Sequence, residues 1–256
     1  MTNTAHGNFV WYELLTSEPP ATLGFYEHVL GWTSDNSEPI GAHAVFATEQ
    51  GPLASVTDLP PEARAMGAGP FWTSVVQVDN VDDLAEKVRQ LGGRLYHGPT
   101  DYPGVGRLAV VADPFGAVLT LLTRDIVRLA HDPSKPGEVC WRELLSADHE
   151  AAFAFWSALF GWVKSSDFDM GPMGKYAIFG RDGADFGGMF TKPKDVPVSA
   201  WVYYFQVSNL DAAIERATRG GGKLCNGPMR IPSGARIAQL SDPQGAMFAV
   251  HENPKQ

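Results

Sequence analysis

The chain has 256 residues, of which 44 % are hydrophobic and 19 % are charged, a balance typical of folded globular domains. Its 29 acidic and 20 basic residues give a formal net charge of −9, which argues against a nucleic-acid-binding protein. The sequence contains no apolar run of the roughly 18 residues that a membrane-spanning helix needs, and no secretory signal pattern. Its two cysteines, Cys140 and Cys225, lie outside any CxxC motif. We therefore expect a cytoplasmic protein without a membrane partner.

The first strand and helix predicted along the chain occur twice. Residues 9–15, FVWYELL, alternate as a strand, and apolar residues then recur at helical spacing up to Gly31, which suits a left-handed stop. Ser17 is the predicted helix cap, with Pro19 in the first turn. The stretch at 10–32, VWYELLTSEPPATLGFYEHVLGW, returns at 140–162 as CWRELLSADHEAAFAFWSALFGW, an offset of 130 (140 − 10). The chain is therefore a tandem duplication.

A second pair of repeated blocks completes each half. Strands are predicted at 43–48 and 51–56, with counterparts at 176–180 and 186–190, and proline-rich linkers follow at 60–70 and 193–197. Residues 71–93 then match 200–222 at an offset of 129 (200 − 71), each read as a strand, a turn and a helix. Residues 106–122 match 235–251, where Asp113-Pro114 and Asp242-Pro243 indicate tight hairpin turns.

These elements predict an α+β fold. Each half contains two β-α-β-β-(β) units, which gives one domain at residues 8–126, a linker at 127–136 and a second domain at 137–253. Because such strands are half-buried, one sheet face should pack against helices. The other face of a curved sheet lines a cup, which is a common place for small ligands.

The repeated segments resemble the vicinal oxygen chelate superfamily, which includes glyoxalase I, extradiol dioxygenases and bleomycin resistance proteins. FYEHVLGW and FWSALFGW are similar to its FYxxxLGF segment, and VADPFGAVLTLL and LSDPQGAMFAVH to its DPxGxxxEL hairpin. The resemblance covers nearly the whole chain and implies four βαβββ modules, paired into two cupped sheets. More narrowly, the chain resembles tandem glyoxalase-like bacterial proteins of the "hydroxylase" or 27 kDa antigen type. The reaction must still be argued from the site.

The resemblance also locates the positions at which metal-dependent members carry His or Glu ligands. In this chain none of the six positions holds a His or a carboxylate; they are Trp11, Trp141, Thr73, Val202, Thr120 and Ala249. A first-row metal needs three or four converging N or O ligands. We therefore predict no cofactor. Glu143 and His251, each two residues along a strand from such a position, remain the alternative ligand pair for a divalent metal.

Strand alternation predicts the side chains that face each cup. The expected catalytic residues are Glu13 and Glu143, because a desolvated carboxylate can act as a general base beside a carbonyl group. The expected substrate-binding residues are Trp11, Thr73, Gln77, Tyr102, Arg107 and Thr120 in the first half, and Trp141, Tyr204, Gln206, Arg236 and His251 in the second. The competing interpretation is structural: the tryptophans pack the sheet, the glutamines satisfy backbone groups, and Arg107 and Arg236 form salt bridges with the two glutamates.

Three functions fit these patterns. The first is a glyoxalase- or dioxygenase-like protein that binds a small carbonyl-containing or aromatic metabolite. Such a protein could also transform this metabolite, as an isomerase, lyase or hydroxylase. The second is a non-catalytic drug- or toxin-sequestering protein of the bleomycin-resistance type, and the third a scaffold whose cups are filled by side chains. A metal-dependent dioxygenase or lyase with displaced ligands is a further alternative. Pairing of the two halves within the chain predicts a monomer, with a homodimer as the alternative.

Overall fold

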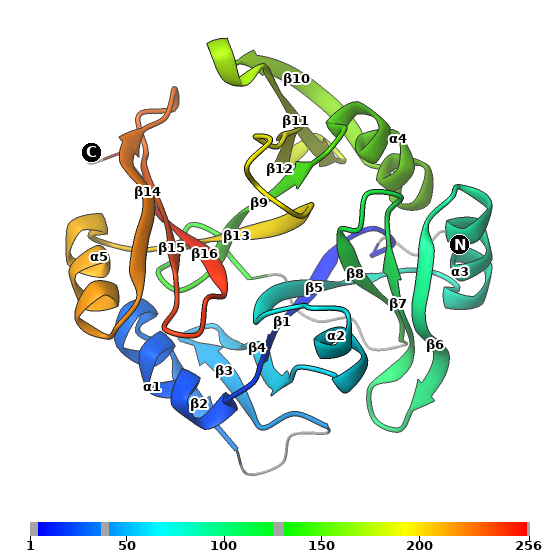
Figure 1. Cartoon of the computed structure of the whole chain (residues 1–256), viewed down its shortest axis with the longest axis horizontal. Coiled ribbons are helices and arrows are strands. Elements are labelled where there is room, and N and C mark those ends of the chain that lie inside the picture. Colours follow the sequence, from blue (N-terminus) through cyan, green and yellow to red (C-terminus); the bar gives the residue numbers. More distant parts are fainter. Residues whose placement is uncertain (1–4, 37–40, 125–130, 255–256) are drawn as a thin grey trace. The chain divides into compact units, whose positions relative to one another are not determined.

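The computed structural model describes residues 5–36, 41–124 and 131–254 and contains four consecutive βαβββ modules (Figure 1). Module 1 comprises β1 (Phe9–Thr16), α1 (Pro19–Leu30), β2 (Thr33–Asp35), β3 (Ala44–Thr48) and β4 (Gly51–Asp58). Module 2 comprises β5 (Phe71–Gln77), α3 (Val81–Gln90), β6 (Arg94–Tyr102), β7 (Gly106–Ala112) and β8 (Val118–Thr123). The predicted domain end at 126 and the first part of the predicted linker, 127–130, lie outside the described residues.

The second half repeats this order. Module 3 comprises β9 (Val139–Ser146), α4 (His149–Phe160), β10 (Val163–Asp169), β11 (Lys175–Arg181) and β12 (Ala184–Thr191). Module 4 comprises β13 (Ala200–Gln206), α5 (Leu210–Arg219), β14 (Lys223–Arg230), β15 (Arg236–Ser241) and β16 (Met247–Glu252). The prediction of an α+β fold with four such modules is confirmed. None of the helices in the described ranges is both long and apolar enough to cross a membrane.

The strands form two eight-stranded mixed sheets, in the orders β2-β3-β4-β1-β5-β8-β7-β6 and β10-β11-β12-β9-β13-β16-β15-β14. Within each module the first strand runs parallel to the last, as β1 does to β4 and β13 to β16. The second, third and fourth strands of each module are joined as antiparallel hairpins. This register places Glu143 beside Gly188 and Gln206 beside His251.

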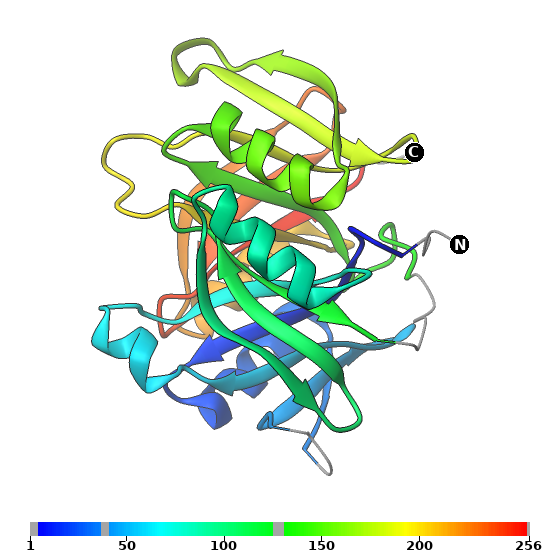
Figure 2. The same ribbon diagram turned by 90° about the vertical axis from the view of Figure 1, so that its right-hand side faces the viewer.

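Residue contacts divide the chain into two compact units. Unit 1 contains residues 1–11, 73–129 and 141–201, and unit 2 contains residues 12–72, 130–140 and 202–256. Each unit joins two modules through their helices: α3 contacts α4 in unit 1, and α1 contacts α5 in unit 2. Figure 2 shows α3 in teal and α4 in yellow-green side by side.

Each unit is built around a buried aspartate from a DP hairpin. In unit 1, Asp113 accepts backbone N–H bonds from Phe115 and Ala117, and Trp156 Nε1 donates to its second oxygen at 3.2 Å. In unit 2, Asp242 accepts the equivalent backbone bonds, and the Tyr26 hydroxyl donates to it at 3.2 Å. The DP motif therefore ties a hairpin to the aromatic helix of another module.

Two local expectations are corrected by the structure. Ser17 does not cap α1, because its hydroxyl donates to Gln244 Oε1; the helix begins after Glu18 without a side-chain cap. The predicted linker at 60–70 contains a short helix, α2 (Pro61–Ala65), which follows a proline. Gly31 and Gly161 end α1 and α4 in the left-handed conformation, with φ of 76° and 71°, as glycine permits.

Candidate functional site

The sheet face formed by β9, β11 and β12 in unit 1 carries a chain of hydrogen bonds that ends on a buried carboxylate. Trp141 Nε1 donates to the Tyr176 hydroxyl at 2.7 Å, and that hydroxyl donates to Glu143 Oε2 at 3.0 Å. Glu143 is only 6 % exposed. Tyr176 itself is half-buried, and a buried carboxylate that accepts from such a hydroxyl donor is held in a defined orientation. This face therefore has the composition of a site for proton transfer.

The position of the Tyr176 ring depends on a glycine of the neighbouring strand. The ring stacks on Phe190, with centroids 5.9 Å apart and planes at 27°. A β-carbon at Gly188 would overlap the Tyr176 ring, so the absence of a side chain at 188 creates the space that the ring fills. Three residues of β11 and β12 thus place one hydroxyl beside Glu143.

The equivalent glutamate of module 1 has different neighbours. Thr57 Oγ1 donates to Glu13 Oε1 at 3.4 Å, a longer bond than the one from Tyr176 to Glu143. Burial raises the pKa of Glu13 above its ordinary value, and the Thr57 bond opposes this rise. His43 occupies the position of Tyr176 and bonds Asp58 through Nε2 at 2.7 Å. Both Glu13 and Trp11 are half-buried.

On the face of β13, β15 and β16 in unit 2, a second polar network crosses the strands. Asn226 Nδ2 donates to Gln239 Oε1 at 3.3 Å, and Gln239 Nε2 donates to the Tyr204 hydroxyl at 2.9 Å. The strand between Gln239 and Tyr204 contributes Ala249 to this row. Because alanine is small, the glutamine amide reaches across β16 to the tyrosine.

The next row of the same face pairs an amide with an imidazole. Gln206 Oε1 lies 2.8 Å from His251 Nδ1. Burial lowers the pKa of His251 below its ordinary 6.5, so the neutral ring is favoured at neutral pH. Gln206 is buried and His251 is half-buried. The sequence prediction therefore placed Tyr204, Gln206 and His251 on one face, and the structure brings them together within unit 2.

The corresponding face of module 2 is less polar and bonds mainly to backbone. Thr73 Oγ1 donates to the Val118 carbonyl at 3.2 Å, and Gln77 Nε2 donates to the Arg124 carbonyl at 3.3 Å. Thr120 is 5 % exposed and pairs in the parallel register with Val75. The Gln77 contact agrees with the structural interpretation, in which the glutamines satisfy backbone groups.

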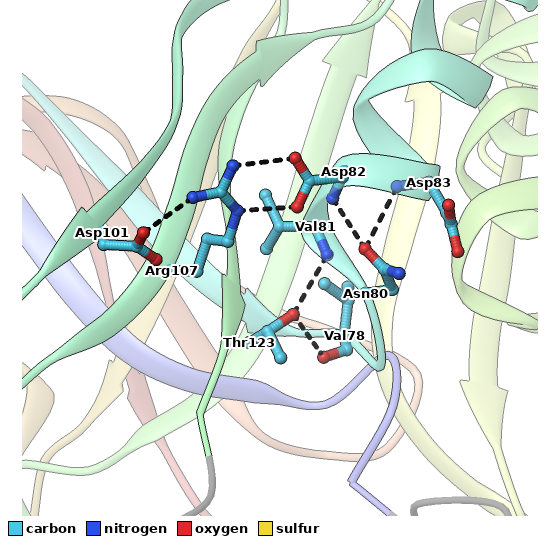
Figure 3. A network of polar contacts seen from close by, with 8 residues as sticks. All are labelled: Val78, Asn80, Val81, Asp82, Asp83, Asp101, Arg107 and Thr123. Atoms are coloured by element: carbon cyan, nitrogen blue, oxygen red, sulfur yellow. Dashed lines mark hydrogen bonds and ion pairs between the residues drawn. The ribbon is translucent and has the colours of Figure 1, made fainter.

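Arg107 and Arg236 bind the first turn of the helix in their own module. Arg107 donates from Nε and Nη2 to the two oxygens of Asp82 at 2.6 and 2.8 Å, and from Nη1 to Asp101 at 3.0 Å (Figure 3). These bonds hold the pKa of Asp82 below its ordinary value. Arg236 likewise bonds both oxygens of Asp211, at 2.9 and 2.7 Å. The repeated arginines therefore fasten β7 and β15 to α3 and α5.

Figure 3 also shows why α3 begins where it does. Asn80 Oδ1 accepts from the backbone N–H groups of Asp82 and Asp83, and Thr123 Oγ1 accepts from that of Val81. Acidic residues in a first helical turn are favoured by the helix dipole. Elsewhere in the module, the Tyr102 hydroxyl lies 2.8 Å from Nε2 of His97 on the same strand, β6.

The residues present do not fit the metal site that the resemblance to the vicinal oxygen chelate superfamily implies. The six inherited ligand positions carry aromatic, hydroxyl or aliphatic side chains; at one of them, Ala249, the Gln239 amide crosses the strand instead. Among the residues that the structure describes, no group of three or more His, Cys, Asp or Glu is placed to hold a metal. The alternative pair, Glu143 and His251, supplies two ligands, fewer than the three or four that a first-row metal needs.

Sequence reasoning missed Tyr176, Phe190 and Gly188. The signal was present, because YAIFG and FGGMF align with HAVFAT and the strand at 51–56, and tyrosine then replaces His43 while glycine replaces Ser55. Such differences between the halves become informative only with the strand register.

The sequence profile of the Glyoxalase/Bleomycin resistance protein/Dioxygenase superfamily matches residues 8–121 and 141–250. The chain is 32 % identical over 243 residues to the Mycobacterium bovis protein named "Putative glyoxylase CFP32", covering 94 % of this chain and 92 % of that protein. It is 30 % identical over 275 residues to the "Anthracycline biosynthesis protein DauV" of a Streptomyces species, covering 98 % and 95 %.

Among solved structures, the fold is similar to that of the Mn(II)-bound glyoxalase from Novosphingobium aromaticivorans. The TM-score is 0.66 at 15 % sequence identity, and the match covers 98 % of this chain and 83 % of the glyoxalase. At this identity the likeness concerns the fold alone.

Proposed function

The chain belongs to the Glyoxalase/Bleomycin resistance protein/Dioxygenase superfamily, and from this premise we propose that it binds a small carbonyl-containing or aromatic metabolite and removes a proton beside the carbonyl group. The observation that carries the proposal is the hydrogen-bond chain from Trp141 through Tyr176, both half-buried, to the buried Glu143. The names of two relatives agree with this ligand class, since one refers to a glyoxylase and the other to the biosynthesis of anthracyclines, which are aromatic ketones.

In the proposed reaction Glu143 is the general base. Its carboxylate takes the proton from the carbon next to the substrate carbonyl, which leaves an enolate and a protonated Glu143. When the first carbon also carries a hydroxyl group, this intermediate is an enediolate. Return of the proton to the former carbonyl carbon, with transfer of the hydroxyl proton to the former carbonyl oxygen, isomerises the substrate without gain or loss of atoms or electrons. Tyr176 positions the carboxylate through the 3.0 Å bond, and the aromatic rings of Trp141 and Phe190 provide an apolar surface for the ligand. Glu13 has the same proposed role in the first half.

The test uses the hemithioacetal of phenylglyoxal and 2-mercaptoethanol, an aromatic probe with one acidic C–H beside a carbonyl group. In D₂O, NMR should show protein-dependent loss of this proton signal. Because a positioned general base contributes roughly 100-fold or more, the variant that carries both Glu13→Gln and Glu143→Gln should lower the rate by at least that factor, and Glu143→Gln alone should remove the contribution of the second half. Glu13→Gln measures the contribution of the first half.

The other functions predict different results in the same assay. An unchanged exchange rate in the variant that lacks both glutamates would refute the general-base role. Stabilisation by the probe without any exchange would instead indicate a sequestering protein, since binding alone raises the melting temperature by mass action. A rate abolished by a chelator and restored by a divalent metal would favour a metal-dependent enzyme. An absence of both exchange and stabilisation would refute the proposed ligand class.

A further inference from the structure

The β13–β15–β16 face of unit 2 is more polar than its duplicated counterpart in module 2. The sequence offset of 129 identifies the counterparts. Tyr204, Gln239 and His251 stand where module 2 has Val75, Val110 and Leu122, and glutamine is present in both, at 206 and 77. A buried polar group costs stability unless it is hydrogen-bonded. The common scaffold does not require these three polar residues, because module 2 folds with aliphatic ones.

The contacts of Gln206 define which nitrogen of His251 carries the proton. Gln206 Nε2 is directed at the Val207 carbonyl, at 3.4 Å, so its amide oxygen faces the imidazole. An amide oxygen only accepts hydrogen bonds, and therefore Nδ1 of His251 is the protonated nitrogen. Since the ring is neutral, Nε2 carries an unshared electron pair.

Nε2 of His251 is available to a ligand. It has no hydrogen-bond partner among residues 5–36, 41–124 and 131–254. It is also accessible to solvent, because the buried nitrogens without a partner in those ranges do not include it. His251 itself is half-buried, so a bond formed there is only partly exposed to competition from water. The neighbouring row supplies the Tyr204 ring, whose hydroxyl is bonded to Gln239.

We propose that the Gln206–His251 pair is a recognition site for a hydroxyl group of a phenol or an enol, with Nε2 of His251 as the hydrogen-bond acceptor. Carboxylates and ketones without an O–H or N–H group have no proton to offer to this nitrogen. The site rests on unit 2 alone and does not depend on proton removal by Glu143. The ligand recognised at unit 2 is a member of the proposed ligand class that carries a donor hydroxyl.

A matched pair of probes tests the site. 4-Methylphenol, which keeps its proton at neutral pH, carries a hydroxyl group, and 4-methylanisole carries a methoxy group at the same position. Calorimetry should show that the protein binds the phenol about fivefold more tightly, the effect of one hydrogen bond. His251→Leu should abolish this preference and still fold, because leucine occupies the equivalent position 122. His251→Gln, which keeps an acceptor near Nε2, should retain part of it.

The tautomer is tested separately. ¹⁵N NMR of histidine-labelled protein should show His251 protonated at Nδ1, and Gln206→Leu should release this tautomer. Equal affinity for the two probes, an absence of phenol binding, a preference that survives His251→Leu, or protonation at Nε2 would each overturn the proposal.

Discussion

Replacement of Gly188 by alanine tests whether the Tyr176 ring needs the space that the absence of a side chain at position 188 leaves on β12. The new methyl group would overlap the ring, so one of two things must happen. If the ring stays, overpacking costs about 1–3 kcal/mol. If it moves away, its hydroxyl loses the bonds to Trp141 and Glu143, each of which contributes about 0.5–1.5 kcal/mol. Both routes predict a loss of about 1–3 kcal/mol in the free energy of unfolding.

The measurement is urea unfolding followed by tryptophan fluorescence, for Gly188→Ala in the wild-type and in the Tyr176→Ala backgrounds. Without the ring the three atoms nearest to the new methyl group are absent, so the substitution should cost less than about 0.5 kcal/mol in the second background. Gly24→Ala is the matched control, because Gly24 lies within α1 and its β-carbon would meet nothing within 4 Å. It should stabilise the protein by about 0.5–1 kcal/mol.

Two results would contradict this reasoning. Gly188→Ala without a measurable loss would mean that Tyr176 does not occupy the space above the glycine. An equal loss in both backgrounds would mean that the cost comes from the β12 backbone and not from the tyrosine. If the reasoning holds, Gly188→Ala should also lower the exchange rate of the phenylglyoxal probe, because Glu143 loses its positioning hydroxyl.

Three further predictions concern buried polar groups. Burial raises the pKa of Glu13, so the wild-type protein should lose stability as the pH rises from about 4.5 through the folded-state pKa; Glu13→Gln should remove this loss in pH-dependent urea unfolding. Burial lowers the pKa of His251, so stability should fall as the pH drops below 6.5 through the folded-state pKa, and His251→Gln should flatten that dependence. Trp72 Nε1 donates to the Tyr26 hydroxyl at 2.9 Å, whereas Nε1 of its counterpart Trp201 is buried without a hydrogen-bond partner in the described ranges. Trp72→Phe should therefore lower the free energy of unfolding by about 1 kcal/mol more than Trp201→Phe, as measured by thermal or urea unfolding.

The fold could be predicted from sequence because duplication makes each pattern appear twice. Apolar residues at helical spacing, followed by a glycine, predicted α1 and α4. The Asp-Pro hairpins predicted the last two strands of modules 2 and 4, β7–β8 and β15–β16. The short strand β2 and the fully exposed strand β10 were missed, since exposed strands lack the alternation of apolar residues that reveals a buried face.

The candidate site was less predictable, because the direction in which a long side chain points depends on its hydrogen-bond and ion-pair partners. Strand alternation placed Glu143 and Gln206 on the inner faces, but it also assigned Arg107 to the ligand. In the structure Arg107 forms a two-bond pair with Asp82, at the start of a helix 25 residues earlier. Such a pairing between strand and helix is set by tertiary packing, which neither periodicity nor spacing encodes.

The differences between the duplicated halves are the most informative feature of this chain. Both halves keep the hairpin aspartates, the helix-binding arginines and the buried tryptophans, and these residues are all explained by contacts that support the fold. The Tyr176 hydroxyl and the His251 imidazole occur in one half only, and in each case a neighbour has changed with them: glycine stands at 188 and alanine at 249. At the equivalent positions the first half has Ser55 and Thr120, so in each case the smaller residue of the second half leaves room beside a polar side chain. We infer that the two halves differ in the groups that they offer to a ligand: the second half presents a phenol hydroxyl and an imidazole at positions where the first half has His43 and Leu122.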